Sequence, residues 1–239
     1  MLAANDNEYK GKAQMLYNTY RPVKFSQVIG QQGITLLTRQ SVKNRFAHAY
    51  LFFGASGAGK TTTARIVAMA LLCQHKGADS EPCGQCQDCK AIQNGSHWDV
   101  LEINAAANPD IQAVQELNRK AFLCPTNGRH KVYIIDECHR YTIGAWSAML
   151  KLVEEPPAYL TIILCTTDKA GVPDTISSRC QLINFNPVAP ADIAKRLLQI
   201  ATQESVNIPV NAVQQIADNC NGNIRQAETM LDQILCMAV

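Results

Sequence analysis

Hydrophobic residues along the chain alternate between short uninterrupted runs and stretches where they recur at helical spacing. The short runs predict strands at Ala49–Phe53, Asp99–Asn104, Lys131–Ile135, Thr161–Cys165 and Gln181–Phe185. Between them, apolar residues every three to four positions predict helices, including Thr61–Leu72, Ile111–Phe122 and Ile143–Glu154. Strands that are buried on both faces and separated by helices are typical of a parallel sheet with crossover helices.

The pattern changes after Pro187, where only helical periodicity continues. Three helical segments are predicted at about 191–204, 211–219 and 223–238. Pro209 and the turn at Asn221-Gly222-Asn223 separate them. Residues 1–14 contain no apolar core, and we expect them to form a flexible arm. We therefore expect an α/β domain over 15–186 and a small three-helix domain over 187–239.

The composition is that of a protein with a substantial core. Of the 239 residues, 47% are hydrophobic and 18% are charged, and the formal net charge is +2. This balance neither requires nor excludes nucleic acid, because a weakly basic face can be hidden in a nearly neutral total. No secretory signal is visible, and the longest apolar run, Ile66–Cys73, is too short to span a membrane. We expect a cytoplasmic protein with no membrane partner.

Residues 54–61 match the phosphate-binding pattern G-x-x-x-x-G-K-[ST], between a predicted strand and a predicted helix. Glycines let the backbone curl so that its N–H groups face phosphate oxygens, and the helix N-terminus adds partial positive charge. Lys60 is expected to reach the outer phosphates, and the Thr61 hydroxyl to ligate Mg²⁺. The alternative, a chance glycine-rich turn, is disfavoured by the flanking elements. The predicted binding residues are Gly54, Ala55, Ser56, Gly57, Ala58, Gly59, Lys60, Thr61 and Thr62.

Two neighbouring carboxylates follow the third predicted strand. Asp136 and Glu137 come at its carboxyl end, where open α/β sheets bind their ligands. With a phosphate loop upstream, Asp136 is expected to hold Mg²⁺ and Glu137 to polarise the attacking water. A solvated acidic turn is the alternative for any single pair of this kind.

Four of the ten cysteines lie at the spacing of metal ligands, as C-x9-C-x2-C-x2-C: Cys73, Cys83, Cys86 and Cys89. Two C-x-x-C steps and a fourth thiol suit a tetrahedral, structural zinc ion. A redox pair and an iron–sulfur cluster are the alternatives, and the latter is not excluded by the residues alone. The six remaining cysteines are interpreted as small buried hydrophobic residues, because a disulfide framework is unusual in a reducing compartment.

Further motifs resemble a particular family. The chain is similar to the clamp-loader AAA+ ATPases, and in detail to the gamma/tau subunit of bacterial DNA polymerase III. The similar segments are Tyr20-Arg21-Pro22, Phe25–Gln31, His48–Phe52, Leu150–Pro157, Cys165–Asp168 and Ser178-Arg179-Cys180. Together with the cysteine module at 73–89, they cover the chain from about residue 15 onward in the family's order.

The resemblance implies roles that spacing does not reveal. Thr167 resembles sensor 1, which contacts the γ-phosphate or the attacking water. Arg179 resembles an arginine finger that acts on ATP bound by a neighbouring subunit, and Arg225 resembles sensor 2 on the helical lid. Without the resemblance, both arginines would be interpreted as surface residues. The residues implied to flank the adenine are Arg21, Pro22, Val28 and Ile29.

Some positions depart from the family. Cys138, Arg140 and Tyr141 stand where apolar residues are usual in a region that helps contact the clamp. Asn108-Pro109 stands where basic or small residues are often found near DNA. The family's third domain, a helical collar that builds a five-subunit ring, is expected to be absent, through truncation or because this is a natural short form.

The resemblance implies an AAA+ P-loop ATPase with a five-stranded parallel sheet, a zinc-binding insertion and a helical lid. It would use ATP and Mg²⁺ to load a sliding clamp onto primer–template DNA, together with other clamp-loader subunits or copies of itself. DNA contact would be to phosphates and independent of sequence. The alternatives are another AAA+ DNA-processing ATPase, such as a branch-migration motor or helicase loader, and a non-hydrolysing module that binds a replisome partner.

Overall fold

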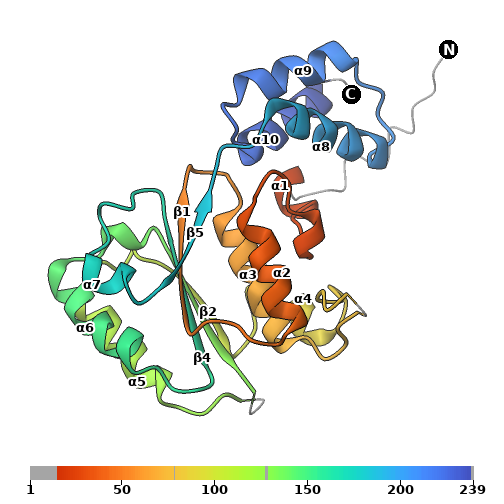
Figure 1. Cartoon of the computed structure of the whole chain (residues 1–239). Helices are drawn as coiled ribbons and strands as arrows, with labels where there is room; N and C mark the ends of the chain where they lie inside the picture. The colour runs from red at the N-terminus through yellow and green to blue at the C-terminus, as the bar shows by residue number, and fades with distance from the viewer. Residues whose placement is uncertain (1–14, 78, 127–128, 238–239) are drawn as a thin grey trace. The chain divides into compact units, whose positions relative to one another are not determined.

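A computed structural model describes residues 15–77, 79–126 and 129–237, which form two structural units. Of these, residues 22–186 make up one unit, apart from the gaps just given, and residues 15–21 and 187–237 make up the other. Each unit has its own secondary structure and is described separately (Figure 1). None of the helices in the described ranges is both long enough and apolar enough to cross a membrane.

A five-stranded parallel sheet forms the centre of the larger unit (Figure 1). Its spatial order is β2-β3-β4-β1-β5. The strands are β1 (Ala49–Gly54), β2 (Val100–Asn104), β3 (Lys131–Asp136), β4 (Leu160–Thr166) and β5 (Gln181–Phe185). The predicted five-stranded parallel sheet is confirmed. Because all strands run parallel, the carboxyl ends of β1, β3 and β4 meet at one edge of the sheet.

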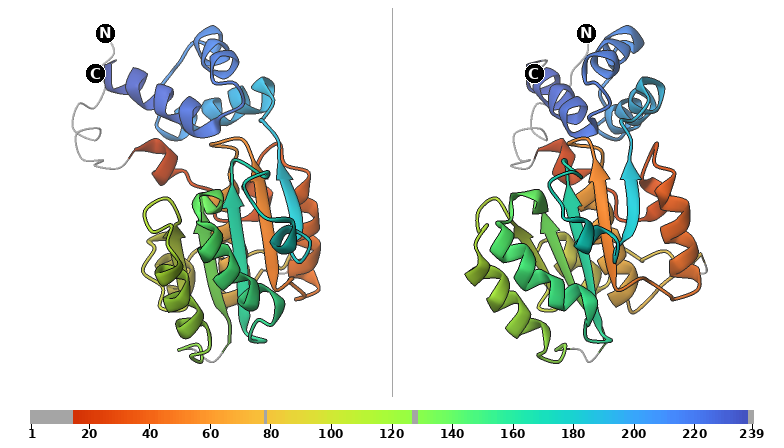
Figure 2. Two further views of the ribbon diagram at one scale, coloured as in Figure 1. Left: turned by 90° about the vertical axis from the view of Figure 1, so that its left-hand side faces the viewer. Right: turned by 60° about the vertical axis from the view of Figure 1, so that its left-hand side comes forward.

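Helices cover both faces of the sheet (Figure 2). One layer contains α2 (Gly33–Val42), α3 (Lys60–Leu72) and α4 (Gln87–Gln93). The opposite layer contains α5 (Ile111–Ala121), α6 (Ile143–Glu154) and the short α7 (Asp174–Ser177). Two 3₁₀ turns, η2 (Phe25–Gln27) and η3 (Cys138–Arg140), complete the unit.

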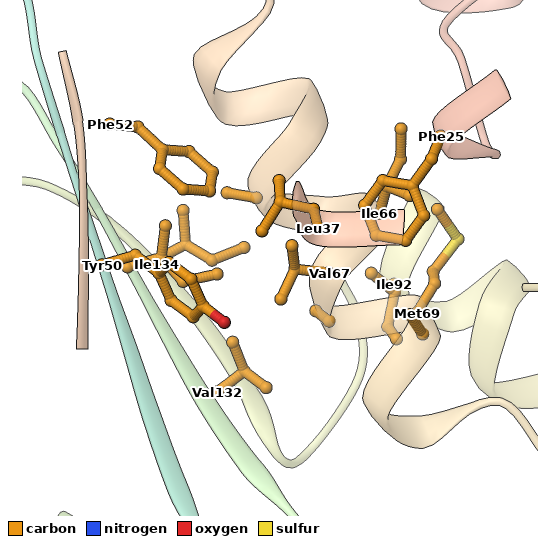
Figure 3. Packing of buried hydrophobic residues seen from close by; sticks show 14 of the residues in the cluster. Phe25, Leu37, Tyr50, Phe52, Ile66, Val67, Met69, Ile92, Val132 and Ile134 are labelled. Atoms are coloured by element: carbon orange, nitrogen blue, oxygen red, sulfur yellow. The ribbon is translucent and has the colours of Figure 1, made fainter. Parts of the chain in front are cut away.

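Alternation along the strands divides the core into two halves. Tyr50 and Phe52 of β1 face the α2–α3–α4 layer, where they lie near Leu37 and Val67 (Figure 3). Leu51, between them in the sequence, packs on the α5–α6 side. All positions of β4 are buried, since strands flank it on both edges and helices cover both faces. Full burial explains why its central residues, 162–165, form a continuous apolar run rather than an alternating pattern.

The second unit is helical. It contains α1 (Leu16–Thr19), α8 (Pro190–Gln203), α9 (Val210–Asn219) and α10 (Ile224–Met237). Amphipathic faces supply its core, with Ile193, Leu197, Val213 and Leu231 buried. The three predicted C-terminal helices are therefore present.

Residues 15–21 belong to this helical unit, whereas the sequence pattern places them with the α/β domain. The reason lies in their side-chain contacts. Leu16 is buried, the Tyr20 hydroxyl donates to the Glu204 carboxylate, and Arg196 donates to the Tyr20 carbonyl. Burial, reinforced by the Glu204 hydrogen bond, raises the pKa of Tyr20 to about 12. These contacts join segments that are far apart in the sequence, so local periodicity carries no sign of them.

Candidate nucleotide-binding site and metal centre

The phosphate loop connects the end of β1 to the start of α3. Gly54 ends the strand with φ +143°, and a Cβ there would lie 2.0 Å from the carbonyl oxygen of Phe185. Gly59 caps α3 with φ +98°, a conformation that other residues rarely adopt. The strand–loop–helix context that the motif requires is therefore present, with the N–H groups of the first turn of α3 at its mouth.

Lys60 is largely buried and folds back over the loop. Its Nζ donates to the carbonyl oxygens of Gly54, at 2.8 Å, and Ala55, at 2.9 Å. Only 6% of the residue is exposed to solvent. A buried ammonium requires nearby oxygen partners, and phosphate oxygens are the anionic equivalents of the carbonyls seen here. The charge is thus held within the loop rather than in solvent.

The tertiary structure joins the loop to the acidic end of β3. The Thr61 hydroxyl donates to Oδ2 of Asp136 at 2.8 Å, although 75 positions separate the two residues. A hydroxyl oxygen and a carboxylate oxygen beside a phosphate-binding turn are hard ligands of the type that Mg²⁺ prefers. The two residues predicted to hold Mg²⁺ are therefore in direct contact.

Glu137 stands at the turn after β3. Its backbone has φ 50° and ψ 40°, in the left-handed region, which costs on the order of 1–3 kcal/mol for a residue other than glycine. The Asp136 side chain accepts the Glu137 N–H at 3.0 Å and helps to hold this turn. Thr167, just beyond the end of β4, donates its hydroxyl to Oε2 of Glu137 at 3.1 Å. The structure thus brings Glu137 and Thr167 together.

Two more residues belong to this cluster, and sequence reasoning missed both. Nδ1 of His139 lies 2.9 Å from the Thr166 hydroxyl and 3.5 Å from Oε2 of Glu137. The signal in the sequence was faint: a histidine two positions after the acidic pair, and a threonine before the predicted sensor. Their proximity depends on β3 and β4 being neighbours in the sheet.

The arginines that the resemblance assigns as finger and sensor 2 make contacts outside the Glu137 cluster. Arg179, between α7 and β5, is exposed, and its guanidinium bonds to Glu154 at 2.8 Å and to the Thr175 carbonyl at 2.6 Å. Arg225, at the start of α10, lies over the ring of Tyr17 at 5.9 Å. Arg225 belongs to the helical unit, separate from the unit that carries the loop.

The residues implied to flank the adenine are divided between the two units. Arg21 belongs to the helical unit and donates to the Asn18 side chain at 3.0 Å. Pro22, Val28 and Ile29 are half-buried residues of the α/β unit, on either side of the η2 turn.

The four predicted metal ligands converge. The sulfur atoms of Cys73, Cys83, Cys86 and Cys89 all lie within 4.8 Å of one another. Cys73 follows the end of α3, Cys89 lies in α4, and the other two lie in the intervening loop. Four thiols at mutual contact distance form a group that can hold one metal ion with protein ligands alone.

Backbone N–H groups surround the thiols. The N–H groups of Gln85 and Cys86 donate to the Cys83 sulfur at 3.4 and 3.3 Å, and the Cys83 N–H donates to Cys73 at 3.4 Å. Donation from Gln85 and Cys86 lowers the pKa of Cys83 to about 6. Burial instead raises the pKa values of Cys73 and Cys89. The loop therefore favours the thiolate form of Cys83, while a nearby cation would be needed for the buried thiols of Cys73 and Cys89 to ionise.

Glu81 ties the cysteine loop to the segment before α2. Its carboxylate accepts the N–H groups of Phe25, at 2.7 Å, and Ser26, at 2.9 Å. The side chain is almost fully buried. A buried carboxylate with two N–H donors is well satisfied, and it also caps the first turn of η2.

Of the residues that depart from the family pattern, some lie in the core and others on the surface. Cys138 and Tyr141 are buried and pack in the α5–α6 half of the core, whereas Arg140 is exposed. Asn108 is exposed and Pro109 is half-buried in the loop before α5. Among Cys138, Arg140 and Tyr141, Arg140 therefore offers the most surface to a partner.

Two family models match the chain. The model described as "DNA polymerase III, delta subunit" matches residues 29–189, which is more than half of the chain. A model for an AAA+ ATPase lid domain of the RCF1/5-like type matches residues 195–234. The fold is also that of the Thermotoga maritima RuvB Holliday junction branch migration motor. The TM-score is 0.65 at 17% identity, covering 91% of this chain and 65% of that one.

Among curated proteins, the chain is 41% identical over 223 residues to DNA polymerase III subunit tau of Bacillus subtilis. This match covers 93% of the chain and 39% of the relative. The chain is also 36% identical over 223 residues to DNA polymerase III subunit gamma of Buchnera aphidicola subsp. Acyrthosiphon pisum. That match covers 93% of the chain and 62% of the relative. The chain thus spans less than two thirds of each of these relatives.

The sheet, phosphate loop and helical unit define a P-loop nucleotide-binding protein of the AAA+ class. Within that class, the chain belongs to the DNA polymerase III subunit family that the longer model describes, and the resemblance to the gamma/tau subunits is confirmed.

Proposed function

We propose that the chain is an ATPase subunit of a DNA sliding-clamp loader. The observation that carries this proposal is the contact between Thr61 and Asp136, which joins the phosphate loop to an acidic strand end that also holds Glu137. This is the arrangement that phosphoryl transfer requires: a phosphate cradle, oxygen ligands for Mg²⁺ and a base beside them. The likeness to DNA polymerase III gamma and tau subunits supports the choice of clamp loading among AAA+ activities.

In this proposal, the N–H groups of the loop cradle the β- and γ-phosphates. Lys60 exchanges its carbonyl partners for phosphate oxygens, which are stronger acceptors because they carry charge. Thr61 and Asp136 would hold Mg²⁺, which neutralises charge on the phosphates when bound. Their hydrogen bond of 2.8 Å supports this assignment, since it holds two oxygen ligands side by side.

Glu137 then orients and deprotonates the attacking water, and Thr167 senses the γ-phosphate. The hydrogen bond between them supports a linked pair, since the Thr167 hydroxyl must leave Oε2 of Glu137 to reach phosphate. Phosphate would thereby change the hydrogen bonding of the catalytic base. That coupling makes hydrolysis responsive to a bound triphosphate.

We further propose that Arg179 completes the active site of a neighbouring subunit. Its exposure and its pairing with Glu154 at the surface suit a guanidinium that can be transferred to a partner's phosphate. Arg225, with Arg21, Pro22, Val28 and Ile29 around the adenine, would respond to nucleotide within the same chain. Residues 187–239 would then act as a lid on the α/β domain, in line with the lid-domain match.

The cysteine cluster is proposed to hold zinc in a structural role. Four thiols, with N–H donors to two of the sulfur atoms, fit a tetrahedral ion and leave no ligand position for water. The proposed partners are other clamp-loader subunits or copies of this chain, a ring clamp, and primer–template DNA. The cytoplasm, where replication occurs in bacteria, is the proposed location.

The test is the ATPase rate of the purified chain with and without candidate partners. We expect stimulation by a sliding clamp together with primed DNA, and a fall in that stimulation as salt increases. Stimulation by four-way junctions instead would favour a branch-migration motor, the activity named for RuvB, whose fold this chain shares. ATP binding without turnover under any of these conditions would favour a non-hydrolysing module.

A further inference from the structure

Four polar side chains meet where β3 and β4 end, and the proposed chemistry uses only two of them. Glu137 and Thr167 are the proposed base and sensor, while His139 and Thr166 have no role so far. Nδ1 of His139 is 2.9 Å from the Thr166 hydroxyl and 3.5 Å from Oε2 of Glu137. Only 13% of the His139 side chain is exposed, so solvent screens these contacts weakly.

The hydrogen bonds of Thr166 determine which ring nitrogen of His139 carries the proton. The Thr166 hydroxyl has one hydrogen, which it donates to the Asp168 carbonyl at 2.8 Å. It also accepts the Asp168 N–H at 3.0 Å. Toward His139 the hydroxyl oxygen can therefore act only as an acceptor, and Nδ1 must be the donor. That N–H bonds to Thr166, and Nδ1 also lies 3.5 Å from Oε2 of Glu137, close enough for its partial positive charge to act on the carboxylate.

One hydroxyl donor and one ring nitrogen thus approach the same oxygen of the proposed base. The Thr167 hydroxyl lies 3.1 Å from Oε2 and Nδ1 of His139 lies 3.5 Å from it. The two side chains differ in how freely they can move. Thr167 is exposed and is proposed to turn toward phosphate, whereas His139 is packed in place, since a Cβ on Gly171 would lie 2.8 Å from the His139 Cβ.

We propose that His139 is a positioning residue for Glu137. When Thr167 turns toward the γ-phosphate, the Nδ1–H group of His139 keeps Oε2 in place, so that Oε1 faces the attacking water. The inference rests on the proposed ATPase function, because it assigns a role relative to the proposed base. Thr166 contributes by presenting a lone pair that holds the imidazole in the Nδ1-protonated tautomer.

The first test compares four full-length proteins: wild type, His139→Leu, His139→Asn and His139→Gln. Asparagine can place an amide nitrogen near the position of Nδ1, while the longer glutamine side chain places it nearer that of Nε2. We expect His139→Leu and His139→Gln to lower the hydrolysis rate by about 10- to 100-fold, the cost of a misplaced catalytic group. His139→Asn should stay within about threefold of wild type, and ATP affinity should change by less than about twofold in all three variants, because the contact acts on the chemical step.

Two controls define the range of the measurement. Glu137→Gln sets the rate without the proposed base, and His48→Leu alters an exposed histidine at the opposite end of the sheet. All rates are measured with the sliding clamp and primed DNA present, and wild-type hydrolysis there no faster than that of Glu137→Gln would refute the ATPase proposal itself. Wild-type hydrolysis well above that floor, with equal rates for the asparagine and glutamine variants, would refute the role of His139 alone.

A spectroscopic measurement tests the contact independently of turnover. Long-range ¹H–¹⁵N correlation spectra of the full chain should show His139 protonated at Nδ1, with an Nδ1 resonance that shifts in Glu137→Gln. A ring protonated at Nε2, or an Nδ1 resonance unaffected by Glu137→Gln, would overturn the inference even if His139→Leu proved too unstable to assay.

Discussion

The phosphate site and the cysteine cluster lie in the same α/β unit but are built in opposite ways. The phosphate site joins residues from the loop after β1, the end of β3 and the end of β4, more than a hundred positions apart in the case of Thr61 and Thr167. The cysteine cluster lies within positions 73–89, and its thiols are surrounded by N–H groups of the same segment.

The contacts in the two sites also differ in what can replace them. Lys60, Thr61 and Thr167 bond to protein oxygens that phosphate or Mg²⁺ could replace. In the cysteine cluster, all four ligand atoms come from the protein, and further hydrogen bonds tie the loop to its surroundings through Glu81. This difference is consistent with the proposed roles: a site for exchangeable ligands in the first case and a structural metal site in the second.

Removing the metal should have the largest effect, and it should be local. We expect Cys89→Ser, or chelation, to unfold residues 73–89, because structural zinc supplies about 10–16 kcal/mol of apparent binding free energy in small modules. Zinc content and hydrogen exchange of this segment would measure the loss. Cys124→Ser is the matched control, because Cys124 lies outside the cluster and, contrary to the expectation that the six other cysteines are buried, is exposed, as is Cys236. If chelation stopped hydrolysis while the fold survived, the metal would belong to the active site. The distinction between a phosphate site and a structural metal site would then be wrong.

Arg179→Ala tests whether the phosphate site depends on a neighbour. ATP affinity should be unchanged, while turnover in the assembled form should fall by about 10³-fold, the lower range for arginine fingers. Arg119→Ala, on the exposed end of α5, serves as the control in the same ATPase assay. Weaker binding of ATP to the isolated Arg179→Ala chain would contradict the assignment in trans.

Lys60→Ala should abolish detectable ATP binding, or weaken it by at least about 100-fold, since a buried charge partner of the phosphates is lost. A fluorescent ATP analogue would report the affinity, with Lys151→Ala on the exposed face of α6 as the control. The cysteine cluster should retain its metal in this variant. Tight nucleotide binding by the Lys60→Ala variant would show that the loop does not bind phosphate as proposed.

Glu81→Gln should give the smallest of these effects. The amide can accept only one of the two backbone N–H groups that the carboxylate accepts, so we expect the free energy of unfolding to fall by about 1–3 kcal/mol. Chemical denaturation measures this change. Glu116→Gln, which removes an exposed ion pair with Lys120, should leave the midpoint nearly unchanged. Equal midpoints for the two variants would argue that the cysteine loop is not anchored through Glu81.

Much of the molecule could be predicted from local patterns. The β5 strand has the predicted bounds, and α6 runs over Ile143–Glu154 as expected, because apolar periodicity reports which face of an element is buried. The phosphate loop and the cysteine spacing are also local, since glycine conformations and C-x-x-C geometry depend on neighbours in the sequence.

What the sequence determined by itself was therefore the set of elements, the phosphate loop and the four clustered thiols that can hold a metal ion. Only the tertiary structure decided that Thr61 meets Asp136, that His139 reaches Glu137, and that residues 15–21 pack with the C-terminal helices. The physical reason is that these contacts depend on strand order in the sheet and on packing between distant segments. Neither leaves a periodic trace in the chain.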